Sequence, residues 1–216
     1  MTGPIVVINP NSNTAVTEGI SAALDGFRFS GGPDIECITL LEGPFGIESQ
    51  ADSDAVIMPQ LALMRTRPDA SAFVIACYSD PGLEAAREQL SQPVFGIQES
   101  GVLTALARGD QFGVIALSEP AIARHRRYLR RMGVLGRLVA EQAADLSVSD
   151  SAADGALNAL SEAGERLAAN GADVIVLGCA GMAGHRTNLE AKLGLPVIDP
   201  CQAAVAAAFG TVIVGR

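Results

Sequence analysis

The chain has 216 residues, of which 49% are hydrophobic and 18% charged, and its formal net charge is −9 at pH 7. The acidic balance argues against broad binding to nucleic acid or anionic lipid, and no apolar run approaches the ~20 residues of a membrane span. Four cysteines without close spacing do not form a disulfide framework, and no basic leader is visible, so we expect a protein of the reducing cytoplasm.

Strands and helices alternate along the first half of the chain. Apolar runs predict strands, and apolar residues that recur at helical spacing predict helices. The predicted elements are a strand at 5–9, a helix around 16–24, a strand at 35–41, a helix at 51–64 perturbed at Pro59, a strand at 72–77, a helix at 83–90 and a strand at 94–97.

The second half continues this alternation, with a left-handed stop predicted at Asn170-Gly171. The predicted elements are a strand at 112–117, a helix from about 119 to 132, a long helix from about 153 to 169, strands at 173–178 and 196–199, and an Ala-rich final helix over 203–214. Such alternation is typical of parallel sheets covered by helices.

The helix at 119–132 carries a basic segment, 124–131, that departs from the acidic character of the chain. Ile122, Leu129 and Met132 fit one apolar face, and the arginines occupy the later turns, where a helix favours cations. We expect this basic face to meet solvent or another subunit rather than a ligand. Together with the apolar tail 203–214, it is the predicted contact surface of a homo-oligomer.

Three landmarks recur in the same order and at similar spacing in the two halves. The strand from Val6 is matched by the strand from Val114, the loop of Cys77 by that of Cys179, and the segment 93–97 by 196–200. This pattern indicates a structural repeat, although α/β chains without a repeat also supply apolar strands at such intervals.

Cys77 and Cys179 each follow a predicted strand, at the edge where parallel α/β folds bind their ligands. Asp80 is predicted to cap a helix that starts at Pro81, whose free N–H groups would favour the Cys77 thiolate. Gly181 permits close backbone approach after Cys179, and a helix is expected near Met182. By contrast, Cys37 and Cys201 fit inert core positions.

These segments resemble the Asp/Glu/hydantoin racemase superfamily, and most closely its hydantoin racemase branch. The resemblance spans nearly the whole chain and is carried by 8–13, 76–83, 96–100, 177–182 and 196–199. It implies an α/β fold of two similar lobes, each a mainly parallel sheet flanked by helices, related by a pseudo-twofold with the active site in the cleft between them. We assign residues 1–100 and about 200–216 to the first lobe, and about 101–199 to the second.

The resemblance also implies racemisation without a cofactor or metal, in which Cys77 and Cys179 act on opposite faces of one carbon. Inversion through a planar carbanion needs a base on one face and an acid on the other, and two thiols serve either enantiomer. A reference pKa of about 8.5 keeps both forms of a thiol accessible. Related arylmalonate decarboxylases keep the second-half cysteine alone, so two cysteines favour racemisation.

Several groups are candidates for holding the substrate and its developing negative charge. They are Asn11, Tyr78, Ser79, Ser118 and the backbone at Ala180 and Gly181, with Phe45 and Ile47 as pocket walls. The chain departs from the hydantoin racemase pattern at Ala116-Leu117, where those enzymes commonly carry hydroxyl residues, which puts substrate contact there in doubt.

The predicted substrate is a 5-substituted hydantoin or a similar cyclic ureide such as allantoin, because the cysteine and Asn-Pro-Asn motifs hold no cation for a free carboxylate. Arg124 or His185 could still reach the cleft, although a surface or helix-cap role is preferred for His185. The alternatives are an aspartate or glutamate racemase, a single-thiol decarboxylase or isomerase, and a two-lobed binding protein without catalysis. His125 and His185 have no motif linking them to a thiol, which disfavours hydrolase chemistry.

Overall fold

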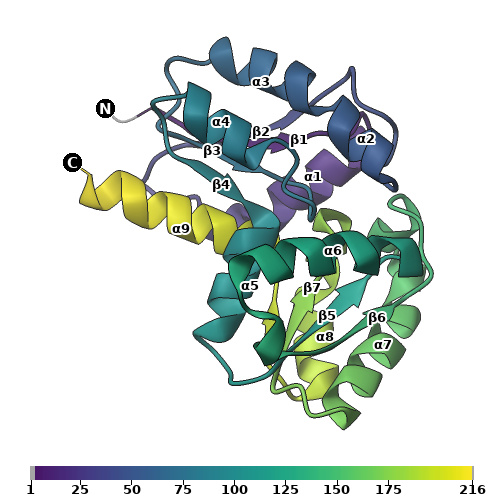
Figure 1. Cartoon of the computed structure of the whole chain (residues 1–216). Helices are drawn as coiled ribbons and strands as arrows, with labels where there is room; N and C mark the ends of the chain where they lie inside the picture. Colours follow the sequence, from purple (N-terminus) through teal and green to yellow (C-terminus); the bar gives the residue numbers. More distant parts are fainter. Residues whose placement is uncertain (1–2, 216) are drawn as a thin grey trace.

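The computed structural model describes residues 3–215 as two α/β lobes (Figure 1). Each lobe contains a four-stranded sheet, with strand order β2-β1-β3-β4 in the first and β6-β5-β7-β8 in the second. Every neighbouring pair is parallel, so the two sheets share one topology. The predicted fold of two similar lobes with parallel sheets and flanking helices is confirmed; residues 1, 2 and 216 of the predicted first lobe lie outside the described residues.

The elements of the first sheet and its helices lie in the first half of the chain. They are β1 (Ile5–Asn9), α1 (Thr14–Ala23), η1 (Asp25–Phe27), β2 (Ile35–Thr39), α2 (Gln50–Ala55), α3 (Ile57–Arg65), β3 (Ala72–Ile75), α4 (Leu83–Gln89) and β4 (Val94–Gly96). The predicted helix at 51–64 is two helices, because the ring of Pro59 would clash with the Ala55 carbonyl of a continuous helix.

The second half supplies the other sheet and the final helix. Its elements are α5 (Ile97–Leu106), β5 (Phe112–Ala116), α6 (Glu119–Met132), η2 (Leu135–Arg137), β6 (Leu138–Ala143), η3 (Asp150–Ala152), η4 (Asp154–Ala156), α7 (Leu157–Ala169), β7 (Val174–Leu177), η5 (Ala180–His185), α8 (Arg186–Leu193), β8 (Val197–Ile198) and α9 (Pro200–Val214). Neither α5 nor β6 was predicted from the sequence, and the helix expected near Met182 is the 3₁₀ helix η5, which leads directly into α8. Gly171 takes the predicted left-handed conformation after α7, with φ of 95°.

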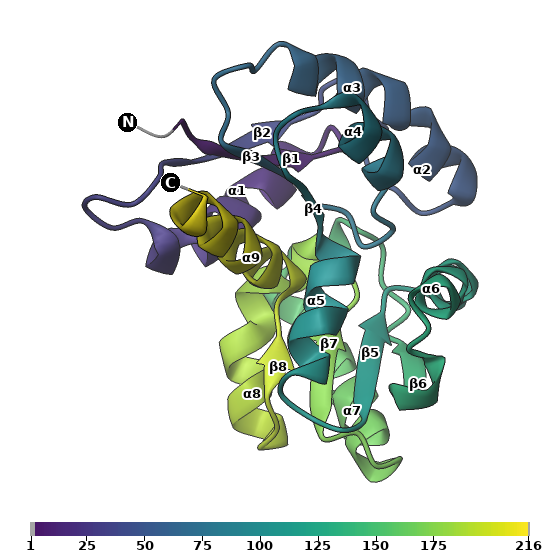
Figure 2. The same cartoon turned by 60° about the vertical axis from the view of Figure 1, so that its left-hand side comes forward.

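The two lobes share an apolar core around α5 and α9. The largest buried cluster runs without interruption from Val7 in β1 to Val176 in β7, and it includes Val102 of α5 and Val205 of α9. The chain crosses between the lobes at the start of each of these helices, and the helices pack against each other (Figure 2). The lobes are therefore joined by a packed helix pair rather than by extended linkers.

Helix α9 buries much of the tail that we expected to form a subunit contact. Ala204, Val205 and Ala208 are fully buried, and α9 packs against β1, β3 and β4 of the first lobe. Ile213 and Val214 at its end are exposed. Among residues 3–215, no helix has both the length and the apolar character that would let it cross a bilayer.

Asp80 links the loop after β3 to the first helix of the second lobe. Its backbone is left-handed, with φ of 44°, and its buried carboxylate accepts hydrogen bonds of 2.9 Å from the N–H groups of Gln98 and Glu99 in α5. Gly96 makes room for this contact, since a Cβ there would lie 2.2 Å from the carboxylate. The prediction that Asp80 caps the next helix is therefore wrong, because α4 begins at Leu83 after Gly82.

We expect Asp80→Asn to lower the free energy of unfolding by about 1–3 kcal/mol, because the amide turns an NH2 group toward one of two buried N–H donors. Urea unfolding followed by circular dichroism measures this loss. Asp34→Asn, at an exposed position, is the control and should change stability by less than about 0.5 kcal/mol. Equal stability of the two variants would show that the Asp80 cap does not support the fold.

Candidate active site

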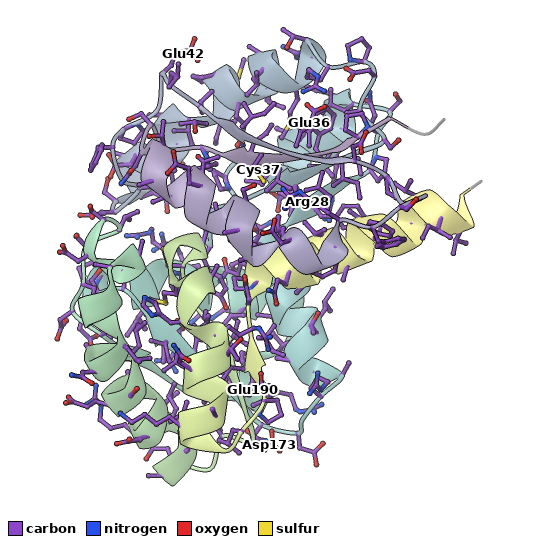
Figure 3. All side chains as sticks on the ribbon, turned by 180° about the vertical axis from the view of Figure 1, so that it is seen from behind. Arg28, Glu36, Cys37, Glu42, Asp173 and Glu190 are labelled. Atoms are coloured by element: carbon purple, nitrogen blue, oxygen red, sulfur yellow. The ribbon has the colours of Figure 1, made fainter. Side chains whose placement is uncertain are left out.

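Each sheet places one cysteine at the point where its strand order reverses. In the first sheet the chain goes outward from β1 to β2 and, on the other side, from β3 to β4. Asn11 follows β1 and Cys77 follows β3, so both lie at the carboxyl edge where this topology opens a crevice. Cys179 follows β7 in the same position of the second sheet. Figure 3 shows Asp173, just before β7, at the far end of the second lobe.

Both thiols line one cavity between the lobes, with a volume of about 40 Å³. Of the predicted site residues, Asn11, Tyr78, Ser79, Ala180 and Gly181 line it as well, whereas Ser118 does not. The full lining is Asn11, Val16, Ile47, Ala76, Cys77, Tyr78, Ser79, Leu117, Ala121, Arg124, His125, Val148, Gly178, Cys179, Ala180 and Gly181. The lining thus combines two thiols, a few polar groups and apolar walls.

Two other predicted positions are corrected. Phe45 is 64% exposed and takes no part in the wall, while Ile47 does. Ser118 begins α6 without a side-chain capping bond, and Leu117 before it faces the cavity instead. The departure at Ala116-Leu117 therefore makes this part of the wall apolar.

The cavity is small in this structure. Sites for small organic ligands usually measure ~300 Å³ or more, whereas this cavity holds a few water molecules. Loops of the two lobes meet beside it, where the Glu48 Oε1 atom accepts a 3.1 Å hydrogen bond from the N–H of Val148. A ring-sized substrate therefore requires the cavity to widen.

Cys77 lies beside a hydroxyl that can donate to it. The Ser79 Oγ atom is 3.3 Å from the Cys77 Sγ atom and 3.1 Å from the Ser53 Oγ atom. Burial and, to a smaller extent, the negative charge of Asp80 raise the pKa of the Cys77 thiol, while its contacts with Ser79 and the positive charge of Arg124 lower it. The predicted preference for the thiolate is wrong, because the loss of hydration on burial outweighs the hydrogen-bond donors.

Cys179 has a different partner set. The Gly181 N–H donates to its Sγ atom at 3.4 Å, and Ser151 Oγ lies 3.9 Å away. Ser151 donates its hydrogen to the Val148 carbonyl at 2.8 Å, so its oxygen can accept from the Cys179 thiol. Burial raises the pKa of Cys179 to about 11. The segment after it is the 3₁₀ helix η5, and it supplies this single backbone donor to sulfur.

Asn11 is held by a buried network of polar side chains. Its Oδ1 atom accepts from the Asn9 Nδ2 atom and from the Asn13 N–H, both at 2.9 Å. Asn9 also donates to the Thr17 hydroxyl at 3.0 Å. Because the Asn11 oxygen is occupied in this way, its amide NH2 is the group left to face a ligand in the cavity.

His125 is a cavity residue that the sequence analysis missed. Its Nδ1 atom lies 2.9 Å from Glu141 Oε2, both side chains are buried, and its ring packs edge-on against Tyr78 at 4.9 Å. Ala121, His125 and Leu129, spaced four residues apart, form the buried face of α6. The sequence signal that could have identified His125 is its position as a polar residue within this series of buried residues spaced four apart.

Arg124 and His185 were the two cations considered for the cleft. Arg124 lines the cavity, so the expectation that the basic helix faces away from ligands is wrong at this position. His185 is buried rather than on the surface. It occupies the N-cap position of α8 without a side-chain capping bond, and its Nε2 atom lies 3.1 Å from the Ser151 carbonyl oxygen, away from the cavity lining.

The remaining cysteines lie elsewhere. Cys37 is on β2 in the first lobe, near Arg28 (Figure 3), and Cys201 is fully buried in the first turn of α9. Neither lines the cavity. The structure thus brings together the two thiols that the sequence singled out.

Comparison with known proteins agrees with this architecture. The family model described as Asp/Glu/Hydantoin racemase matches residues 5–208. The chain is 34% identical to the hydantoin racemase of Paenarthrobacter aurescens, over 98% of this chain and 92% of the relative. It superposes on the allantoin racemase from Klebsiella pneumoniae with a TM-score of 0.93 and 33% identity, covering 100% of this chain and 89% of that one.

The allantoin racemase of Pseudomonas fluorescens is similar as well, with a TM-score of 0.91 and 27% identity over 98% of this chain and 92% of that one. The match to the family model and the identity to the curated relative both extend over nearly the whole chain. This chain belongs to the Asp/Glu/hydantoin racemase family of isomerases.

Proposed function

We propose that the protein racemises 5-substituted hydantoins or related cyclic ureides at C5, without a cofactor. The observation that carries this proposal is that Cys77 and Cys179, from opposite lobes, line the same cavity. The similarity to hydantoin and allantoin racemases over nearly the whole chain supports the substrate class. The four free cysteines fit a reducing cytoplasm, where the two thiols would stay available.

In the proposed reaction one sulfur removes the C5 proton and the other returns a proton to the opposite face. We assign the thiolate that starts the reaction to Cys77, because its contacts with Ser79, together with the charge of Arg124, favour the anionic form against burial and the negative charge of Asp80. Cys179 is then the thiol, which fits the Ser151 oxygen as its acceptor and the negative charge of Glu48 near it. After one turnover the protonation states are exchanged, so the reverse reaction starts from the other sulfur.

The carbanion needs hydrogen-bond donors at the ring carbonyl that shares its charge. The Asn11 amide NH2 is the leading candidate, because its oxygen is already occupied. The Gly181 N–H is committed to Cys179, which leaves the neighbouring Ala180 backbone as a second candidate. The raised thiol pKa helps, because a thiolate that holds its proton more tightly is a stronger base toward carbon.

An aspartate or glutamate racemase is the second candidate. The presence of Arg124 in the cavity wall favours it, since a free amino acid dicarboxylate needs cations. The predominantly apolar lining favours a neutral ring instead, because two carboxylates would lose hydration against apolar walls.

We expect the protein to exchange the C5 proton of L-5-benzylhydantoin in D₂O and to racemise it. Cys77→Ser and Cys179→Ser should each lose racemisation by at least about 10³-fold, because a serine hydroxyl is a far weaker acid and base partner at neutral pH. Proton NMR and polarimetry, with the uncatalysed rate subtracted, measure exchange and inversion separately.

Cys37→Ser is the matched control and should keep full activity, because Cys37 lies outside the cavity. Retention of racemisation in either cavity variant would exclude the two-thiol mechanism. Turnover of free aspartate or glutamate, with no turnover of any hydantoin or allantoin, would replace the proposed substrate class with the second candidate.

The racemisation rate should depend on pH in a bell-shaped way with a basic optimum. Burial raises the pKa of both thiols, so kcat/KM should rise above pH 8 as the first proton leaves the pair. It should fall again near pH 11, where the Cys179 proton needed for delivery is lost. Blank-corrected polarimetry from pH 7 to 11 checks this, and a plateau reached below pH 7.5 would contradict the assigned shifts.

A further inference from the structure

A wider cavity lies next to the thiols and is strongly basic. Its volume is about 490 Å³, and its lining includes Arg124, Arg127 and Arg131 of α6 but a single acid, Asp54. This concentration of positive charge stands out in a chain whose net charge is −9. Cavities of this size are ordinary for small-molecule binding.

Arg124 lies at the junction of the two cavities. Arg124 and Ser79 line both the inner cavity with the thiols and the outer basic cavity. A ring placed between the sulfurs therefore has the Arg124 guanidinium near the path along which its 5-substituent leaves toward the outer cavity. From this position Arg124 can contact the 5-substituent of the substrate as well as its ring.

Arg124 forms no ion pair with a carboxylate in the described part of the chain. Among the described side chains, no carboxylate lies within ion-pair distance of Arg124 or Arg127, whereas Arg131 pairs with Glu84. The Arg124 Nε atom is buried without a hydrogen-bond partner, and its Nη1 atom makes a long 3.4 Å contact with the Pro120 carbonyl.

The acids near Arg124 are already engaged. The Asp52 carboxylate accepts from the N–H groups of Glu48 and Ser49, and Asp54 accepts from the Gln50 side chain at 2.8 Å. Burial lowers the pKa of Arg124, and the nearby Cys77 and Asp52 offset this effect only in part. An anion bound at Arg124 would stabilise the guanidinium charge that burial destabilises.

We propose that Arg124 forms a subsite for an anionic 5-substituent, so that the preferred substrates are hydantoins whose side chain carries a carboxylate. A guanidinium can bind a carboxylate through two parallel N–H···O bonds, which a neutral amide cannot match. Arg127 adds positive charge farther out in the same cavity. This subsite rests on the proposed function and names the substrate class within it.

The test compares two hydantoins that differ in charge and hardly in shape, 5-(2-carboxyethyl)hydantoin and its carboxamide, at pH 8. For the wild-type protein, kcat/KM for racemisation of the acid should exceed that of the amide by about 10-fold to 100-fold, the usual worth of a hydrogen-bonded charge. Arg124→Met should bring this ratio close to one, while Arg124→Lys should leave part of the preference.

Arg126→Met is the control, because Arg126 is exposed on the same helix and lines neither cavity; its ratio should equal that of the wild type. A preference that survives Arg124→Met would overturn the subsite. An equal fall for both substrates would also overturn it, because Arg124 would then act through the Cys77 thiolate alone.

Calorimetric binding of the same two compounds separates this proposal from the proposed function. If neither compound is turned over but the acid binds more tightly than the amide through Arg124, racemisation of hydantoins fails and the anionic subsite stands. If the wild-type protein binds acid and amide equally, the subsite fails whatever the rate of racemisation.

Discussion

The structure depends on holding two buried thiols on opposite walls of one small cavity. Burial raises the pKa of Cys77 and brings that of Cys179 to about 11, so the first proton leaves the pair at basic pH. A pair of this kind can carry a single exchangeable proton and act as acid and base in turn. The two sulfurs stay on opposite walls of the cavity only while the two lobes keep their relative position, because each thiol follows a strand of a different sheet.

Contacts between the lobes maintain this relative position. Asp80, three residues after Cys77, binds the first N–H groups of α5, and α5 packs on α9 and on β7, the strand that ends before Cys179. Gly178 lets that strand end approach β5, since a Cβ there would lie 2.5 Å from the Ile115 carbonyl oxygen. A displacement at either loop would therefore move one sulfur relative to the other.

The two walls differ although the sheets have the same topology. Cys77 has Ser79 and the charge of Arg124 near it, whereas Cys179 has the Gly181 N–H, the Ser151 oxygen and the charge of Glu48. Both enantiomers can still be substrates of a racemase with unequal walls, because the equilibrium between the two enantiomers is the same whichever sulfur acts first. In the proposed mechanism, this asymmetry decides which sulfur loses its proton first and on which side of the cavity a charged substituent would bind.

The sequence by itself determined the strand and helix alternation, the repeated halves and the two cysteines at strand ends, because apolar periodicity and the Cys77 and Cys179 motifs are local signals. It also indicated Asn11, Tyr78 and Ser79, which follow the same strand ends. Helix α5 was missed because it starts directly after β4 without a spacer and has little one-sided apolar pattern.

The tertiary structure decided what those local signals could not. The role of Asp80 as a cap for α5 depends on a contact between residues far apart in the chain, and its left-handed backbone is set by that contact. His125 enters the cavity wall because Glu141, on a neighbouring strand, partners it in the interior. The lack of a carboxylate partner for Arg124 among the described residues could not be recognised from sequence either, since the neighbours of a charge depend on how the chain folds in space.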